Sequence, residues 1–227
     1  MSLLKPKEKE FAVVLLSSGM DSAVCASLAA QEYELAFLHF QYGQKAAKKE
    51  LTCFYKMIDY FKPQKYLVAE LPFFKLIGGS SLTSEELEIP NGSEKQGIPS
   101  TYVPFRNGVF LSLAVAWAEV IGAKKIFIGV NEIDFSGYPD CRKEFIQAFN
   151  QAVNKGTKPE TQITIETPLI NLSKKEIVEL GIKLNTPFHL TWSCYRQTEK
   201  ACGRCDSCRI RLNAFKEAGV KDPIEYA

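Results

Sequence analysis

The chain has 227 residues, of which 46% are hydrophobic and 24% charged, a balance that excludes global disorder and describes a globular protein with an ample core. Its formal net charge of +2 is too small to indicate a nucleic-acid-binding protein from charge alone. The polar start, MSLLKPKEKE, has no apolar stretch before a cleavage site. The longest apolar run, residues 108–123, is too short to span a bilayer. We therefore expect a cytoplasmic protein with no membrane partner.

Five short apolar or β-branched segments have the length of β-strands and are separated by segments that read as helices. In chain order they are residues 11–16, 34–40, 65–69, 124–130 and 162–167. This alternation predicts an α/β fold, with a parallel five-stranded sheet that carries helices on both faces.

Several helices have readable features. Apolar residues recur every three or four positions at Ala47, Leu51, Phe54, Ile58 and Phe61, which predicts one helix face packed on the sheet. A capping box of Ser173 and Glu176 predicts the start of a later helix, and Gly181 predicts its end. The apolar run 108–123 predicts a buried helix. Residues 71–100, rich in Gly, Ser, Pro and Glu, predict a long excursion or lid.

The segment LLSSGMDSAVCASLAAQ follows the first predicted strand. Ser17, Ser18 and Gly19 lie where the chain leaves this strand and enters a helix, and backbone N–H groups can converge on an anion there. A tight turn would also select small residues. No Gly-Lys-Ser/Thr follows, so the segment is not a Walker A loop. Asp21 is either a helix cap or, beside a polyphosphate, a Mg²⁺ ligand, and we favour a nucleotide and metal site.

Four of the seven cysteines, Cys194, Cys202, Cys205 and Cys208, have the spacing C-x7-C-x2-C-x2-C. This spacing lets four thiolates meet at one tetrahedral Zn²⁺, and four sulfur ligands leave no open position, so we expect a structural zinc. Basic residues near the cluster can offset its negative charge. They are Arg196, Lys200, Arg204, Arg209 and Arg211.

The segment around Asp21 resembles the S-G-G-x-D-S signature of the PP-loop ATP pyrophosphatases, with Ser18 in place of the first glycine. Further stretches are similar to the 7-cyano-7-deazaguanine synthase family of queuosine biosynthesis. They are YGQ at 42–44, VPFRN at 103–107, GVNEIDFSGYPDCR at 129–142, TPLINLSKKEI at 167–177 and TWSCY with CGRCDSCRIR near the C-terminus. Phe105 and Ala46 depart from the pattern of that family. The similarity runs from about Phe11 to the C-terminus.

The resemblance implies a PP-loop domain, similar to the adenine nucleotide alpha hydrolases, over residues 1–189 and a zinc-binding element over residues 190–227. It implies a carbon–nitrogen ligase that uses ATP and Mg²⁺ to convert 7-carboxy-7-deazaguanine and ammonia to 7-cyano-7-deazaguanine, by successive adenylation of the carboxylate and the amide. Catalytic roles are implied for Asp21, Lys174 and Arg106.

The binding residues follow from the same resemblance. The nucleotide site would comprise Leu16, Ser17, Ser18, Gly19, Met20, Asp21, Ser22, Ala23, Val24, Tyr42 and Gln44. Residues 129–142 offer many hydrogen-bond donors and acceptors, and the resemblance implies that this loop binds the deazaguanine. An ordinary surface loop could have the same composition. The candidates in residues 129–142 are Asn131, Asp134, Ser136, Gly137, Tyr138 and Asp140.

Two other functions stay open on the sequence. One is another PP-loop adenylating enzyme, such as a tRNA sulfurtransferase, and the other is a non-catalytic zinc protein whose CRIR segment binds nucleic acid. We expect no stable nucleic-acid partner, and a homodimer stays open. We also expect the zinc to hold Trp192 and Tyr195 beside the substrate. The alternative is that it only stabilises the C-terminal segment, far from the reaction.

Overall fold

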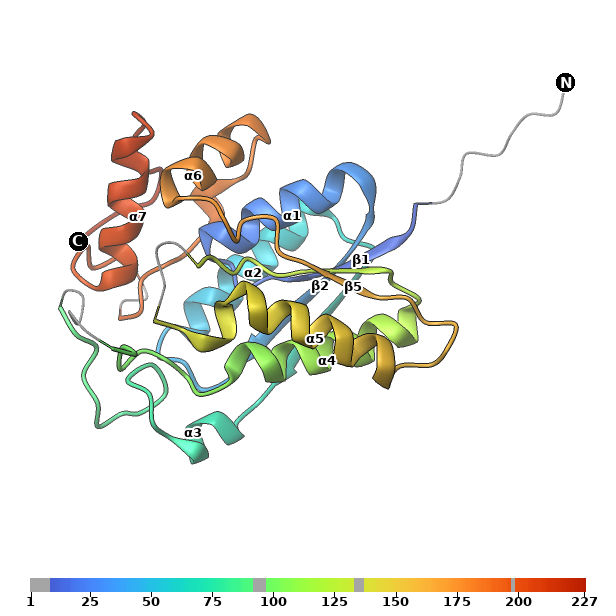
Figure 1. The fold of residues 1–227 in the computed structure, drawn as a ribbon. Helices are drawn as coiled ribbons and strands as arrows, with labels where there is room; N and C mark the ends of the chain where they lie inside the picture. The colour runs from blue at the N-terminus through green and yellow to red at the C-terminus, as the bar shows by residue number, and fades with distance from the viewer. Residues whose placement is uncertain (1–8, 92–96, 133–136, 197–198) are drawn as a thin grey trace, which may run out of the picture.

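The computed structural model describes residues 9–91, 97–132, 137–196 and 199–227, and its core is a parallel sheet (Figure 1). The five strands lie in the order β3-β2-β1-β4-β5. Their bounds are β1 (Phe11–Leu15), β2 (Glu34–Gln41), β3 (Lys65–Glu70), β4 (Lys125–Phe127) and β5 (Thr164–Glu166). All five predicted strands and their parallel pairing are confirmed, with β4 and β5 shorter than predicted.

Helices cover both faces of the sheet because the central strands β1 and β2 are apolar and buried on both sides. Ala12 and Val14 of β1 pack in one core with helices α1 (Met20–Glu32), α2 (Ala47–Phe61), α6 (Lys174–Lys183) and α7 (Asp206–Glu217). Val13 and Leu15 pack in a second core with α4 (Arg106–Ile121) and α5 (Lys143–Gly156). Figure 1 shows α4 and α5 below the sheet and α1, α6 and α7 above it. The predicted α/β architecture is therefore confirmed.

The helix signals hold with two exceptions. The apolar run 108–123 forms α4, but only one face of this helix is buried, and Val120 is 83% exposed. The capping box is present, since Ser173 Oγ accepts from Glu176 N at 3.3 Å and Glu176 Oε2 accepts from Ser173 N at 2.8 Å. The prediction that Gly181 ends the helix is wrong, because α6 continues to Lys183. A Cβ at Gly181 would lie 2.2 Å from Phe188 Cζ. The glycine is therefore required for close packing against Phe188 and does not end the helix.

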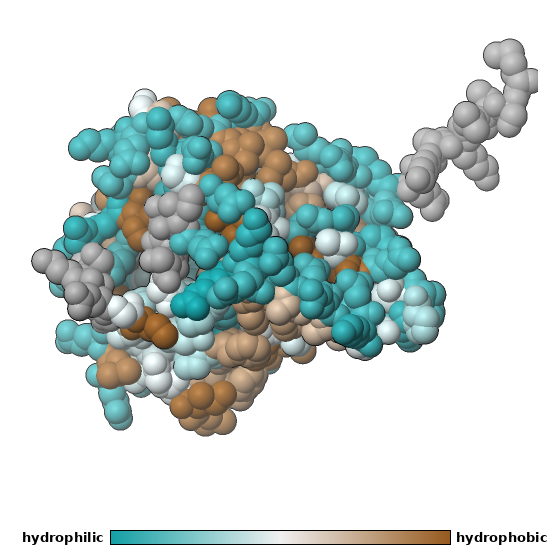
Figure 2. Space-filling model, viewed as in Figure 1, coloured by the Kyte–Doolittle hydropathy of each residue, from teal (hydrophilic) through white to brown (hydrophobic). Residues whose placement is uncertain are grey.

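The connections are mostly irregular. Residues 71–100, where the structure describes them, contain the short helix α3 (Phe73–Ile77) and otherwise turns and extended chain. Two 3₁₀ helices, η1 (Pro139–Cys141) and η2 (Phe188–Leu190), precede α5 and the cysteine cluster. The hydrophobic patch at the bottom of Figure 2 lies over α3, where Leu76 is 86% and Ile77 62% exposed. None of the helices in the described segments is long and apolar enough to cross a bilayer.

Candidate active site and metal centre

A cavity of about 250 Å³ lies at the carboxyl ends of the strands, which is where parallel α/β sheets bind their ligands. The loop between β1 and α1, the end of β2 and the first turn of α4 form one part of its wall. The rest of the wall comes from the residues just after β4, the first residue of α6, and single side chains of other segments. These side chains are Glu50, Tyr138, Cys141, Trp192, Ser193, Tyr195, Ser207, Ile210 and Arg211. Segments far apart in the sequence thus meet around one small space.

Asp21 and Lys174 form an ion pair in this cavity, with Lys174 Nζ 2.5 Å from Asp21 Oδ2. The Lys174 side chain is only 8% exposed and begins α6, where the helix dipole disfavours a cation. Asp21, in the first turn of α1, compensates this charge. The other carboxylate oxygen, Asp21 Oδ1, is buried and has no hydrogen-bond partner among the described residues. Such an orphaned acceptor fits a cation bound beside the pair.

The rest of the predicted nucleotide loop divides into two groups. Ser17, Gly19 and Met20 line the cavity together with Asp21 and Ser22. Ser17 Oγ accepts from Gly19 N at 3.3 Å and donates to Ser22 Oγ at 3.2 Å, which fixes the turn. The second group points away from the cavity and is fully or almost fully buried. It comprises Leu16, Ser18, Ala23 and Val24.

Ser18 has a left-handed backbone conformation, with φ of 68°. A side chain is strained there, which explains why the PP-loop signature has a glycine at this position. The Ser18 hydroxyl is buried without a hydrogen-bond partner among the described residues, while its carbonyl accepts from Trp192 N at 2.8 Å.

Arg106 occupies the wall next to β2. Its Nη1 donates to Tyr42 Oη at 3.0 Å, and its guanidinium lies over the rings of Tyr42 and Phe110, at 5.4 and 5.8 Å from their centroids. Burial raises the pKa of Tyr42 to about 12, so the phenol stays protonated at neutral pH. The arrangement provides a flat aromatic surface beside a fixed positive charge.

Gln44 lies behind this wall rather than in it. Its Oε1 accepts from Tyr42 N at 2.8 Å, and its Nε2 donates to Phe40 O at 3.1 Å and to Glu50 Oε2 at 2.9 Å. Its amide thus shapes the turn after β2, whereas Glu50 lines the cavity. Nothing in the sequence marks Glu50 as a cavity residue, because a glutamate in the first turn of a helix is common for dipole reasons alone.

The predicted substrate loop is only partly at the cavity. Asn131 and Tyr138 line it, and Tyr138 Oη is hydrogen-bonded to Thr101 Oγ1 at 2.7 Å. The side chain of Asp140 faces α4, where its Oδ2 accepts from Asn107 N at 2.8 Å. Gly137 does not line the cavity and packs against the ring of a proline. Asp134 and Ser136 lie outside the described residues.

The segment that carries the cysteines forms the last wall of the cavity. Trp192 and Tyr195 both line it, as expected for side chains held near a ligand. Trp192 N donates to Ser18 O, and Trp192 Nε1 donates to Cys194 O at 2.9 Å. One tryptophan therefore connects the nucleotide loop to the cysteine cluster.

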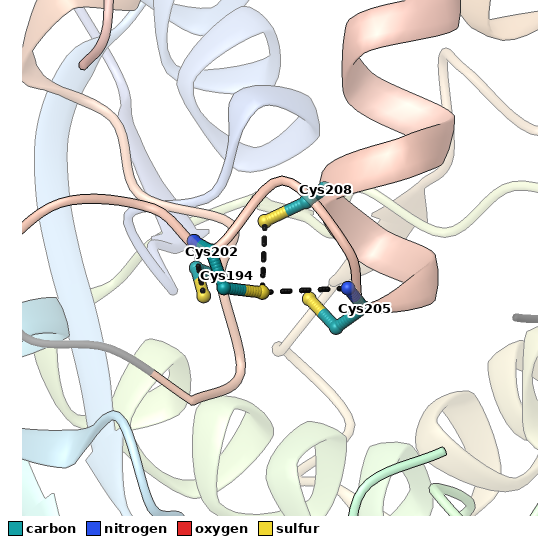
Figure 3. A group of neighbouring side chains, drawn as sticks. All are labelled: Cys194, Cys202, Cys205 and Cys208. Carbon is teal, nitrogen blue, oxygen red and sulfur yellow. Dashed lines mark hydrogen bonds between the residues drawn. The ribbon is translucent and has the colours of Figure 1, made fainter. Parts of the chain in front are cut away.

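The four cysteines come together as the spacing predicted, with all four sulfur atoms within 4.8 Å of one another and buried (Figure 3). A tetrahedral site with Zn–S bonds of about 2.3 Å has sulfur atoms about 3.8 Å apart, so the cluster needs little contraction. Cys194 Sγ accepts from Arg196 N and Cys202 N, each at 3.4 Å. Such N–H donors stabilise thiolates, and the cluster fits a metal ion.

The basic residues near the cluster are not equivalent. Arg211 is 1% exposed and binds Asp222 through Nε at 2.7 Å and Nη2 at 2.9 Å. A buried, paired Arg211 is not available to face a nucleic acid, as the alternative with a nucleic-acid-binding CRIR segment requires of it. Arg204 and Arg209 are exposed, and Lys200 pairs loosely with Glu225 at 3.5 Å.

Comparisons with known proteins agree with this geometry. The family described as "Queuosine biosynthesis protein QueC" matches residues 11–219. A 7-cyano-7-deazaguanine synthase of Nautilia profundicola is 53% identical over 95% of this chain and 97% of its own. One from Chlorobium phaeobacteroides is 55% identical over 95% and 96%. Among solved structures, NMN synthetase from Francisella tularensis shares the fold, with a TM-score of 0.52 at 17% identity over 95% of this chain and 79% of its own. The chain therefore belongs to the QueC family of queuosine biosynthesis proteins.

Proposed function

We propose that the chain is a 7-cyano-7-deazaguanine synthase, a carbon–nitrogen ligase that makes the nitrile from 7-carboxy-7-deazaguanine, ammonia and ATP. The family match is supported by one observation in particular: a single cavity brings the loop after β1, Lys174 and the aromatic side chains next to the cysteines together. That cavity can hold a phosphate chain at one wall and a flat heterocycle at another.

The residues at the β1 end fit Mg-ATP. Asp21 would hold Mg²⁺ through Oδ1, which has no other partner among the described residues, and the ion would neutralise charge on the phosphates. Lys174 and Arg106 are placed to bind phosphate oxygens from two sides of the cavity. The backbone N–H groups at the start of α1 add an anion site.

The chemistry requires two activations, because neither oxygen of a carboxylate leaves as hydroxide at neutral pH. In the first, a carboxylate oxygen attacks the α-phosphorus of ATP and pyrophosphate leaves. Ammonia then attacks the carbonyl carbon and AMP leaves, which gives the amide. In the second, the amide oxygen attacks the α-phosphorus of another ATP, and loss of AMP and the two nitrogen protons forms the nitrile. Lys174 and Arg106 would stabilise the negative charge on the α-phosphate during both transfers, through their fixed positions and without a covalent intermediate on the protein.

We assign Zn²⁺ to the four cysteines, in a structural role. Four thiolates complete its coordination and leave no position for water. The ion would hold Cys194 in place, and with it Trp192, whose indole donates to the Cys194 carbonyl.

A direct assay tests the function. Purified protein is incubated with Mg-ATP, ammonia and 7-carboxy-7-deazaguanine, and nitrile and nucleotide products are measured by mass spectrometry. We expect two AMP per nitrile. Asp21→Asn removes one charge without changing shape and should abolish AMP formation, whereas Asp59→Asn, an exposed carboxylate on α2, should not. ADP as the sole nucleotide product, or full activity in Asp21→Asn, would contradict the proposal.

A further inference from the structure

We infer that Glu50 recognises the guanine-like edge of the substrate, by accepting hydrogen bonds from the ring N–H and the exocyclic amino group of the deazaguanine. This inference rests on the proposed function and assigns a specificity residue to the same cavity.

The position of Glu50 is fixed by the turn that follows β2. Its Oε2 accepts from Gln44 Nε2 at 2.9 Å, and Gln44 is itself held by Tyr42 N and Phe40 O. The other oxygen, Oε1, has no hydrogen bond to any described residue. A carboxylate that is held at one oxygen and free at the other is preorganised to receive donors from a ligand.

The other acidic side chains near the cavity each have a partner, although Asp21 Oδ1, the oxygen proposed to hold Mg²⁺, has none among the described residues. Asp21 is paired with Lys174, and the Asp140 carboxylate accepts from the backbone of α4. Among the described residues that line the cavity, Glu50 is the acidic side chain that makes no salt bridge. Arg106 is close enough to lower its pKa, but burial has the larger effect and raises it.

The chemistry of a carboxylate distinguishes the two bases that this enzyme must bind. The pyrimidine ring of a deazaguanine presents an N–H next to an amino group, and two parallel donors match the two oxygens of one carboxylate. Adenine presents a lone pair on N1 next to its amino group, so a carboxylate would be repelled at one of the two positions. Glu50 therefore favours the substrate over the base of ATP. Tyr42 and Phe110 also line the cavity and offer flat surfaces for stacking.

Glu50 is not placed there for stability. Because burial raises its pKa, the folded protein binds a proton at Glu50 more tightly than the unfolded chain does, and stability contributed at this site is lost as pH rises through the raised value. Glu50→Gln removes this dependence and keeps the hydrogen bond with Gln44 available. We expect its melting temperature at neutral pH to be equal to or higher than that of the wild type, so a loss of function would not reflect misfolding.

The experiment compares the wild type, Glu50→Gln and the control Asp59→Asn, which makes the same chemical change at an exposed site of the same helix. Dissociation constants and KM are measured for 7-carboxy-7-deazaguanine, for its analogue without the exocyclic amino group, and for Mg-ATP. In Glu50→Gln we expect the substrate's dissociation constant to rise about 10- to 100-fold and that of Mg-ATP to stay unchanged. The preference of the wild type for the substrate over the analogue should nearly vanish in the variant.

The outcomes separate this inference from the proposed function. The inference would be overturned if Glu50→Gln binds Mg-ATP more weakly but still prefers the substrate to the analogue without the amino group. Glu50 would then be a nucleotide-binding residue. Unchanged binding of both would overturn it as well. If the wild type binds the deazaguanine but forms no nitrile, the proposed activity fails, and the dissociation constants still decide the role of Glu50. If the wild type does not bind the deazaguanine, both are overturned.

Discussion

Replacement of Arg211 by methionine should destabilise the protein strongly while leaving its apolar contacts largely in place. The guanidinium donates to Asp222 twice, to Thr191 Oγ1 at 2.5 Å, to Ser193 Oγ at 3.3 Å and to Phe188 O at 3.2 Å, so it connects α7 with η2 and the C-terminal residues. The Asp222 side chain is 4% exposed and would be left buried without its partner. Removal of one partner from a buried pair costs about 3 to 5 kcal/mol.

A double variant separates the pair from its surroundings. Arg211→Met with Asp222→Leu removes the orphaned carboxylate, and we expect it to recover more than half of the stability that Arg211→Met loses. Urea denaturation of metal-loaded protein measures all four members of the cycle. The reasoning fails if Arg211→Met costs less than about 1 kcal/mol, or if the two single effects simply add in the double variant.

The cysteine cluster, its neighbours and the loop after β1 each give a further prediction. Denaturation should release about one zinc per chain. Cys205→Ala should lose the metal and unfold more easily, since the free energy of metal binding contributes to the free energy of folding. A metal-free wild type of full stability would contradict this prediction. Trp192→Ala should raise the KM for the deazaguanine about tenfold. The double variant Lys200→Ala with Arg204→Ala should leave turnover nearly unchanged. A loss of nucleic-acid affinity in this double variant would instead favour an RNA-binding role. Ser18→Gly should raise the free energy of unfolding by about 1 kcal/mol by relieving the left-handed backbone, measured by urea denaturation, and a destabilised variant would refute the strain.

The sheet could be predicted because its strands are short apolar runs separated by helix-length segments, and the residues of β1 alternate between two cores. The four-cysteine cluster could also be predicted, because its members lie within fifteen residues and local spacing nearly fixes their geometry. The end of α6 could not be predicted from Gly181, because a glycine required for packing against Phe188 looks the same in sequence as one that ends a helix.

The orientation of individual side chains could not be predicted. Asp140 and Glu50 are both acidic and close to the cavity, yet one caps α4 and the other lines the site. The difference depends on contacts between segments that are far apart in the chain, such as Asp140 with Asn107. The burial of Arg211 could not be predicted either, because its partner, Asp222, lies eleven residues later and gives no sequence signal of pairing.

The ion pair between Asp21 and Lys174 joins positions 153 residues apart, and this separation bears on how the protein is made. A ribosome adds about 5 to 20 residues per second, so the loop after β1 emerges about 8 to 30 s before the lysine that completes it. Trp192, whose backbone holds Ser18, is synthesised later still. A nascent chain can therefore form its first β-α-β unit early, but the proposed site is incomplete until nearly the whole sequence has been translated. Under this proposal, ribosomal stalling or truncation near the end of the message would leave a chain with all its strands and no activity.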